Sequence, residues 1–190
     1  TINDVNSLSI SIVSCQPNPA NISQSVECNA TVIDDIGVDT VNVSVTLPNG
    51  TIESPTVENI GSNYNFTFTT TSITGQYNIT WQANDSSNNI QTNTTNFTVN
   101  DVVNPTVTSL TCSPDPVDQD NAIECNATVT DDVDISTVIA NVTLPNGTVY
   151  DQNVENVGDN YNFTFTNTDQ AGTFTVAWFA NDSSNNINST

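Results

Sequence analysis

The chain has 190 residues and a formal net charge of −21 at pH 7, because its 21 Asp and Glu residues face no Lys, Arg or His. Without a cationic side chain it cannot neutralise phosphate groups, which excludes nucleic acids and other polyanions as partners. It also lacks the imidazole, amine and guanidinium groups that most enzymes use, so we expect no enzymatic activity.

The chain repeats itself at a period of 97 residues without a gap. Of the 93 aligned pairs of residues, 46 are identical, which indicates one domain of about a hundred residues used twice. We predict a first domain at 6–99, a linker at 100–104 and a second domain at 105–190. Residues 1–5 match the end of that first domain and its linker, so we expect them to close a preceding repeat. The second domain stops before most of its last strand.

Each repeat is predicted to contain about seven β-strands. In the first repeat they are 8–14, 25–33, 39–47, 51–58, 63–71, 75–84 and 90–100. Apolar and polar residues alternate along these strands, which indicates one face on a core and one in solvent. Asn49-Gly50 has the chemistry of a hairpin turn. The pattern predicts an all-β fold of two tandem immunoglobulin-like (Ig-like) β-sandwich domains.

Two cysteines in each repeat lie 13 residues apart. Four cysteines permit three pairings, and the self-sufficiency of a repeat favours the local bridges Cys15–Cys28 and Cys112–Cys125. The spacing fits no zinc site. Because disulfides persist in oxidising surroundings, we expect an extracellular or cell-surface protein. No segment is apolar over the length of a membrane span, so we expect no membrane insertion.

Trp81 and Trp178 occupy the same place in the sixth strand of each repeat. We predict that they fill the two cores. An exposed aromatic platform for a ligand is the alternative.

The end of the repeat carries a motif. Trp81-Gln82-Ala83-Asn84-Asp85-Ser86-Ser87-Asn88-Asn89 is followed by a Thr-rich strand at 95–99, then by Asp101 and Pro105. This resembles the Ig-like repeats of bacterial and archaeal cell-surface proteins and adhesins, which tend to end in an Ala-x-Asp-x-x-Gly-Asn turn, a Thr-rich strand and an Asp-containing linker that reaches a Pro. Asn88 stands where those repeats prefer Gly, a change compatible with positive φ. The resemblance implies fold class and compartment, and no particular activity.

Asparagines in Asn-x-Ser/Thr triplets are roughly twice as frequent as chance predicts, and they are candidate N-glycosylation sites. They are Asn21, Asn29, Asn42, Asn49, Asn65, Asn78, Asn84, Asn93, Asn96, Asn126, Asn141, Asn146, Asn162, Asn181 and Asn188. In several triplets the middle residue is the inward apolar one, so the asparagine is predicted to face solvent. Asn42 and Asn93 are replaced in the second repeat by acceptors shifted by two residues, which keeps the strand face. The alternative is that Asn/Thr-rich outer faces generate such triplets by alternation alone.

Aspartates in turns and linkers are candidate calcium ligands, because calcium takes several oxygen ligands. They are Asp101, Asp4, Asp34, Asp35, Asp131 and Asp132. Asp101, in the predicted linker, is the best single candidate. The sequence has no EF-hand spacing, and adjacent aspartates on a turn are usually only solvated. Calcium is therefore the one cofactor that the sequence suggests besides covalent N-linked glycans.

Together these features predict an extracellular structural protein, in which tandem repeats form a glycosylated stalk, surface layer or head-to-tail filament. Abundant acceptor triplets without basic residues favour an archaeal envelope. The alternative is an adhesin-type carbohydrate- or protein-binding module with a cell-surface ligand, which predicts an aromatic loop that differs between repeats. The loops at 84–90 and 181–187 are instead identical. A glycosidase working with carboxylates alone is a more distant alternative.

The expected partners are copies of the protein itself, joined head to tail. Thr1-Ile2-Asn3 matches Thr98-Val99-Asn100, which ends the last strand of the first domain. The second domain would be completed by a continuous chain or by a strand donated from a neighbouring subunit. Continuous chain is the favoured version.

Overall fold

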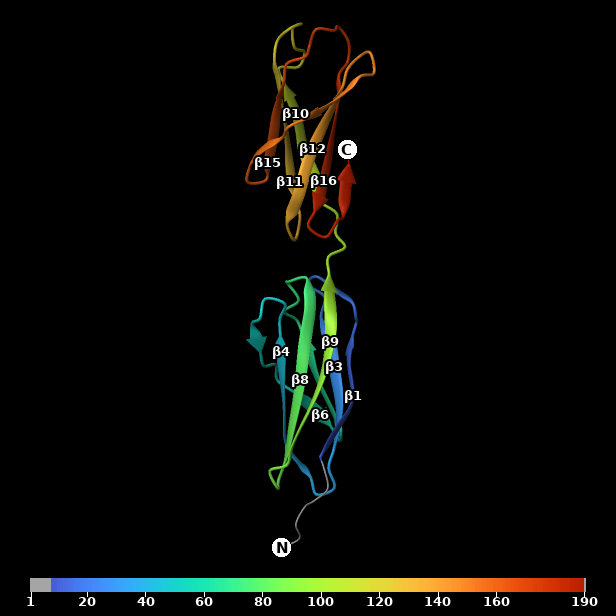
Figure 1. The fold of residues 1–190 in the computed structure, drawn as a ribbon, viewed down its shortest axis with the longest axis vertical. Coiled ribbons are helices and arrows are strands. Elements are labelled where there is room, and N and C mark those ends of the chain that lie inside the picture. The colour runs from blue at the N-terminus through green and yellow to red at the C-terminus, as the bar shows by residue number, and fades with distance from the viewer. Residues whose placement is uncertain (1–7, 190) are drawn as a thin grey trace. The chain divides into compact units, whose positions relative to one another are not determined.

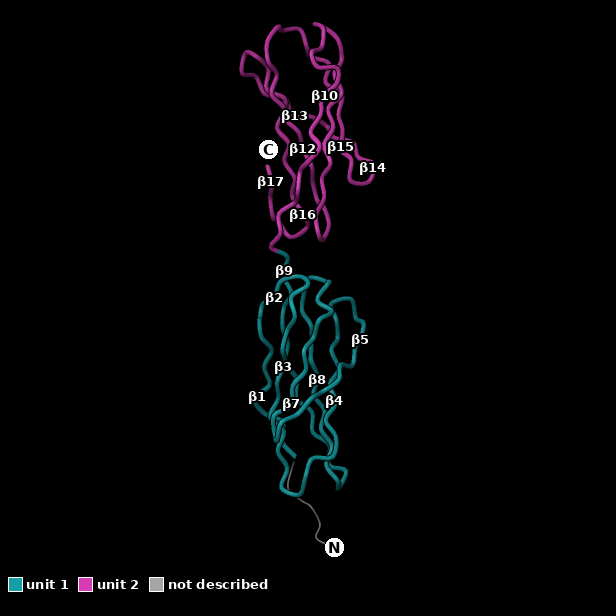
Figure 2. Tube along the Cα trace, turned by 180° about the vertical axis from the view of Figure 1, so that it is seen from behind, with its two compact units in different colours: residues 1–101 teal, residues 102–190 magenta. Residues whose placement is uncertain are grey.

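The structure is a computed structural model that describes residues 8–189, all of whose regular elements are β-strands. Within that range, no helix meets the length and apolarity needed to cross a membrane. The chain divides into two compact units, Thr1–Asp101 (unit 1) and Val102–Thr190 (unit 2) (Figure 2). The division falls inside the segment 100–104, which the sequence predicts to be a linker.

Unit 1 is a sandwich of two sheets (Figure 1). Its strands are β1 (Ser9–Gln16), β2 (Ala20–Asn21), β3 (Val26–Ile33), β4 (Val38–Thr46), β5 (Ile52–Glu53), β6 (Glu58–Ile60), β7 (Asn63–Phe68), β8 (Gly75–Asp85) and β9 (Ile90–Asn100). One sheet has the order β1-β3-β7-β6, and the other has the order β2-β9-β8-β4-β5. All neighbouring strands are antiparallel except β2 and β9, which are parallel. The predicted all-β sandwich is confirmed.

Unit 2 repeats this arrangement over its described residues. Its strands are β10 (Thr106–Ser113), β11 (Ile123–Thr130), β12 (Ile135–Thr143), β13 (Val149–Gln152), β14 (Glu155–Val157), β15 (Asn160–Phe165), β16 (Thr175–Asp182) and β17 (Ile187–Ser189). The sheet orders are β10-β11-β15-β14 and β13-β12-β16-β17. The last strand has 3 residues in unit 2 and 11 in unit 1. The equivalent of β2 is not a strand among the described residues of unit 2.

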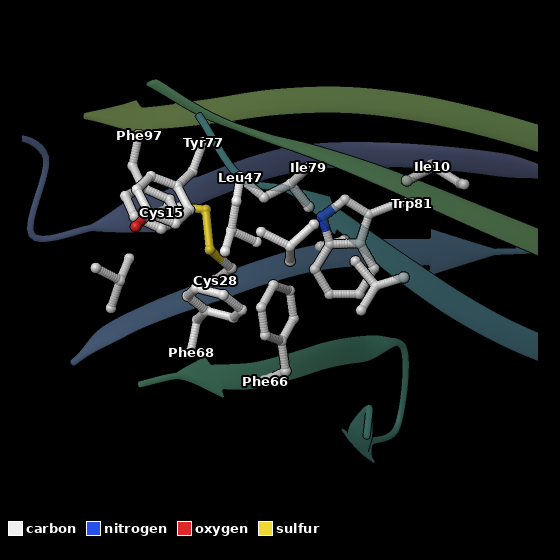
Figure 3. Close-up of a cluster of buried hydrophobic side chains, with 14 of the residues drawn as sticks. Ile10, Cys15, Cys28, Leu47, Phe66, Phe68, Tyr77, Ile79, Trp81 and Phe97 are labelled. Atoms are coloured by element: carbon white, nitrogen blue, oxygen red, sulfur yellow. A yellow bond between two sulfur atoms is a disulfide. The ribbon is translucent and has the colours of Figure 1, made fainter. Parts of the chain in front are cut away.

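The core of unit 1 follows from the alternation of side chains along its strands. On β8, Tyr77, Ile79 and Trp81 are fully buried, while the residues between them face outward. Phe66 and Phe68 point from β7 toward the same layer (Figure 3). The Phe66 and Trp81 rings lie 5.4 Å apart, and the equivalent pair in unit 2 has the same separation. Both tryptophans therefore belong to the cores, as predicted.

The strand predicted at 51–58 is wrong. Within it, Ile52 and Glu53 form β5, which pairs with β4; the chain then leaves this sheet, and Glu58 begins β6, which pairs with β7 in the opposite sheet. Pro55 stands in the crossing segment, where a residue without a backbone N–H donor suits a connection better than a strand interior. The short strand β2, after Pro17-Asn18-Pro19, was not predicted.

Each disulfide joins strands that are neighbours in a sheet. Cys15 and Cys28 occupy directly opposed positions of β1 and β3, with 4.1 Å between their Cα atoms. Cys112 and Cys125 repeat this arrangement between β10 and β11. No cysteine within residues 8–189 is left free. The local pairing that the sequence favours is the one in the structure, and each unit closes its own bridge.

Candidate functional site

The turn between β8 and β9 is built on the carboxylate of Asp85. Its Oδ1 accepts hydrogen bonds from the backbone N–H groups of Ser87 and Asn89, both at 2.8 Å, and its Oδ2 accepts one from the Asn89 amide at 2.6 Å. Asn88 has φ of 66°, so it takes the left-handed conformation that Gly adopts without steric cost. Asp85 is only 1% exposed, which makes it the organising group of the turn.

Unit 2 has the same turn on Asp182. This carboxylate accepts hydrogen bonds from the backbone N–H groups of Ser184 and Asn186 and from the Asn186 amide, and Asn185 has φ of 68°. Asp131 comes close to it: a carboxylate oxygen of Asp131 lies within 4.8 Å of one from Asp182. The chain contains no cationic side chain, so any charge balance at this pair comes from a cation in solution or bound there.

The predicted calcium ligands are placed differently from one another. Asp34 and Asp131 are half-buried and turn inward, where Asp34 Oδ2 accepts from the N–H of Gly37 at 2.8 Å and Asp131 Oδ2 from that of Val133 at 3.1 Å. Their neighbours Asp35 and Asp132 are exposed. Asp101 is the last residue of unit 1 and is buried. Asp4 lies outside the described residues.

Asp182, which the sequence also places in a turn, is not among the six predicted ligands, although the structure brings it to Asp131. The signal was its place in the repeated motif, at the end of a buried strand and before a turn. Two carboxylates offer part of the six to eight oxygen ligands that calcium takes. Calcium binding therefore stays a prediction.

We expect Asp85→Ala to lower the free energy of unfolding of unit 1 by about 2 kcal/mol, since hydrogen bonds to a charged group contribute roughly 1.5–3 kcal/mol. Urea unfolding followed by Trp81 fluorescence in a Trp178→Phe background measures this for unit 1 alone. Asp39→Ala removes an exposed carboxylate and serves as the control. Equal effects of the two substitutions would contradict a structural role for Asp85.

The acceptor asparagines of five strand triplets face outward. The middle residues of five triplets, Ala30, Val43, Phe66, Ile79 and Phe97, are at most 5% exposed. The asparagines that precede them, at 29, 42, 65, 78 and 96, are half-buried or exposed. All the candidate acceptors lie within residues 8–189, and none of them is buried. The predicted orientation is thus correct, whereas attachment of glycans is not tested by it.

Some acceptor amides already have structural partners. The Asn93 amide donates to the Ile10 carbonyl at 2.9 Å, and the Asn188 amide donates to the Pro105 carbonyl at 2.6 Å. At the hairpin tips, Asn49 and Asn146 use their side-chain oxygens instead and leave the amide nitrogen to solvent. Because a glycan is attached to the amide nitrogen, the hairpin tips are better acceptors than Asn93 and Asn188.

The surroundings of Tyr77 affect the ionisation of its hydroxyl. Burial raises the pKa of its hydroxyl, and the hydrogen bond to Ile73 opposes that shift. The hydroxyl donates to the Ile73 carbonyl at 2.9 Å. It stays protonated at neutral pH and ties the β7–β8 connection to the core, which is a structural role.

No protein-family model and no curated protein sequence matches the chain. Among solved structures, a tetra-tandem repeat in the extending region of a large adhesion protein matches with a TM-score of 0.54 and 24% identity, over 97% of this chain and 47% of that one. The amphioxus IgVJ-C2 molecule matches with a TM-score of 0.49 and 19% identity, over 90% and 97% of the two chains. A bacterial ice-binding adhesin has a TM-score of 0.38 and 17% identity, over 97% and 62%. The chain thus shares the fold of the adhesion-protein repeats and spans about half the length of that structure.

Proposed function

We propose that the chain is a structural spacer of an extracellular protein, built from repeated Ig-like units and coated with N-linked glycans. The observation that carries this proposal is duplication. The disulfide, the core tryptophan, the hairpin and the aspartate turn each occur once per unit at equivalent positions. A protein selected for length reuses one unit, because each added unit extends it without new chemistry.

The loops support a spacer over a ligand-binding module. Residues 84–90 and 181–187 share one sequence and the same set of hydrogen bonds to their aspartates. Neither loop contains an aromatic residue, although aromatic anchors are enriched at recognition surfaces. The fold is shared with the extending region of a large adhesion protein, and extension is the role proposed here. Joined head to tail with further copies, such units form a stalk, a surface layer or a filament.

Glycans fit this role because they would cover faces that carry no protective Lys. The acceptors are arranged in cross-strand pairs. Asn29 opposes Asn65 and Asn78 opposes Asn96 in unit 1, and Asn126 opposes Asn162 in unit 2. Directly opposed residues have Cβ atoms about 4.5–5.5 Å apart, which is too close for two branched glycans to leave the surface independently.

We expect glycans at the hairpin tips Asn49 and Asn146, and at no more than one asparagine of each opposed pair in any one molecule. Peptide mass mapping of the native protein, before and after deglycosylation, measures the occupancy of each acceptor. Proteases specific for acidic or aromatic residues are required, because the chain has no tryptic site. Unmodified asparagine at both hairpin tips would contradict the proposed coat.

The spacer role is tested separately on cells that make the protein. An antibody against the 190-residue chain should label intact cells as strongly as permeabilised ones. In single-molecule stretching, the chain should unfold in two events of similar contour length, one for each unit. Labelling that requires permeabilisation, or specific binding of a soluble ligand that is lost on substitution in the 84–90 loop, would overturn the proposal.

A further inference from the structure

Unit 2 contains an open groove between the ends of its two sheets. The groove has a volume of about 620 Å³. Its floor consists of core side chains, including Ile123, Phe165, Phe174 and Val176. The polar residues at its rim include Asp115 and Asp118.

In unit 1 the equivalent space is filled by the second half of β9. Phe97 and Val99 are at most 1% exposed. The Phe97 ring stacks on that of Tyr77, with 4.9 Å between centroids and 9° between planes, and lies 6.1 Å from the Phe68 ring (Figure 3). One Phe and one Val, spaced by two residues, therefore close this end of the core.

The walls of this slot are retained in unit 2. Phe165 and Phe174 stand at the positions of Phe68 and Tyr77, and their rings lie 6.1 Å apart. Cys112, Ile123, Phe174 and Val176 are partly exposed, whereas their counterparts in unit 1 are buried. The apolar surface that β9 covers in unit 1 is thus open to solvent, which is unfavourable unless something covers it.

The backbone segments on both sides of the groove correspond to the ones that hold β9 in unit 1. In unit 1, β8 pairs with β9 along its whole length, from Gly75 with Val99 to Asn84 with Ile90. In unit 2, β16 begins only at Thr175 and pairs with β17 through Phe179–Asn181. The first half of β16 is therefore a sheet edge with unsatisfied hydrogen-bonding capacity toward the groove.

The opposite side of the slot also holds β9 in unit 1. β2 pairs in parallel with Val99 and Asn100, and the Asn18 side chain accepts from the Thr98 N–H at 3.1 Å. The counterparts of β2 and Asn18 in unit 2 are residues 117–118 and Asp115, all of which line the groove. A carboxylate at position 115 retains the acceptor for an incoming N–H group.

We propose that the groove of unit 2 binds an extended strand with the pattern Asn-Phe-Thr-Val, taken from another copy of the repeat. The strand adds antiparallel to β16 and inserts its Phe and Val between the two sheets, as β9 does in unit 1. Main-chain hydrogen bonds supply affinity and the alternate side chains supply specificity. Asp115 and Asp118 at the rim repel acidic segments, so the donor is uncharged, as Thr94–Asn100 is. Binding follows from the groove alone and does not depend on the spacer role.

The probe is a capped synthetic peptide with the sequence of residues 94–100, added to the 190-residue chain. We expect one peptide to bind per chain in calorimetric titration. Binding should raise the melting temperature of unit 2 by several degrees, read from Trp178 fluorescence in a Trp81→Phe background. Unit 1 is the internal control, because its own Phe97 fills the slot, so Trp81 fluorescence in a Trp178→Phe background should report no change.

Two variants test how the strand is held. A peptide carrying Phe97→Ala should bind about tenfold more weakly or worse, because it loses the burial of an aromatic ring. In the protein, Ala171→Trp fills the groove from an exposed position and should abolish binding, whereas Asn153→Trp, also exposed but outside the groove, should leave it intact. Absence of binding at millimolar peptide, equal affinity of the two peptides, or stabilisation of both units alike would overturn the proposal.

Discussion

Trp81→Ala should destabilise unit 1 by about 3–5 kcal/mol, the range for removing a buried Trp or Phe side chain. Trp81 is fully buried and packs on Phe66 between the two sheets. Truncation leaves a cavity that backbone strands on both sides cannot collapse to fill. Since a domain of this size loses roughly 4–8 °C of melting temperature per kcal/mol, the transition of unit 1 should fall by more than about 12 °C.

Calorimetry measures this shift, and unit 2 of the same variant serves as the reference. The chain has 2 tryptophans, one in each core, so in the variant Trp178 fluorescence reports on unit 2 alone. The cores of the two units are separate clusters of residues, and we expect the Trp178 transition to stay in place. Ile60→Ala, at a side chain that is 82% exposed, is the control for loss of an apolar group. A small effect of Trp81→Ala would mean that the core tolerates a void there.

Much of the fold could be predicted because alternation in this chain is nearly uninterrupted. Tyr77, Ile79 and Trp81 mark one strand face without ambiguity, and the duplicate in the second repeat confirms the period. The prediction of one strand at 51–58, after the hairpin, was wrong for a physical reason. The segment contains enough β-branched residues to resemble a strand, but Pro55 stands in its middle and the chain there changes sheets. Which sheet a short strand joins depends on tertiary packing, and local pattern carries no information on it.

The candidate site was predicted less completely than the fold. The outward direction of the acceptor asparagines follows from strand period alone, because their neighbours are inward apolar residues. The role of Asp85 does not follow from period. Its carboxylate lies at the end of a buried strand, where an inward side chain is ordinarily apolar. The three hydrogen bonds that compensate for the burial of this carboxylate come from residues beyond the strand. The approach of Asp131 to Asp182 depends on two loops that are 51 residues apart in sequence.

The groove of unit 2 was predictable only in part. The alignment of the repeats shows that the counterparts of residues 94–99 lie beyond residue 190. It does not indicate that the slot keeps its width, since a sandwich lacking part of a strand can close over the gap. In the structure the groove is open, and Phe165 still packs against Phe174 in its floor.

Loss of a disulfide should cost each unit about 3 kcal/mol, the chain-entropy value for a loop of roughly 15 residues. The two bridges should nevertheless open at different rates under a mild reductant. Cys15 and Cys28 are 4% and 0% exposed, whereas Cys112 is partly exposed and lines the groove. Thiol–disulfide exchange requires access of a thiolate to one of the sulfurs. We therefore expect Cys112–Cys125 to be reduced first and unit 2 to lose its stability while unit 1 keeps its own.

Timed alkylation followed by peptide mass analysis measures the order in which the two bridges are reduced. The fully unfolded chain, in which both bridges are equally accessible, is the reference. Simultaneous reduction of the two bridges in the folded protein would show that access to the groove does not control the reaction.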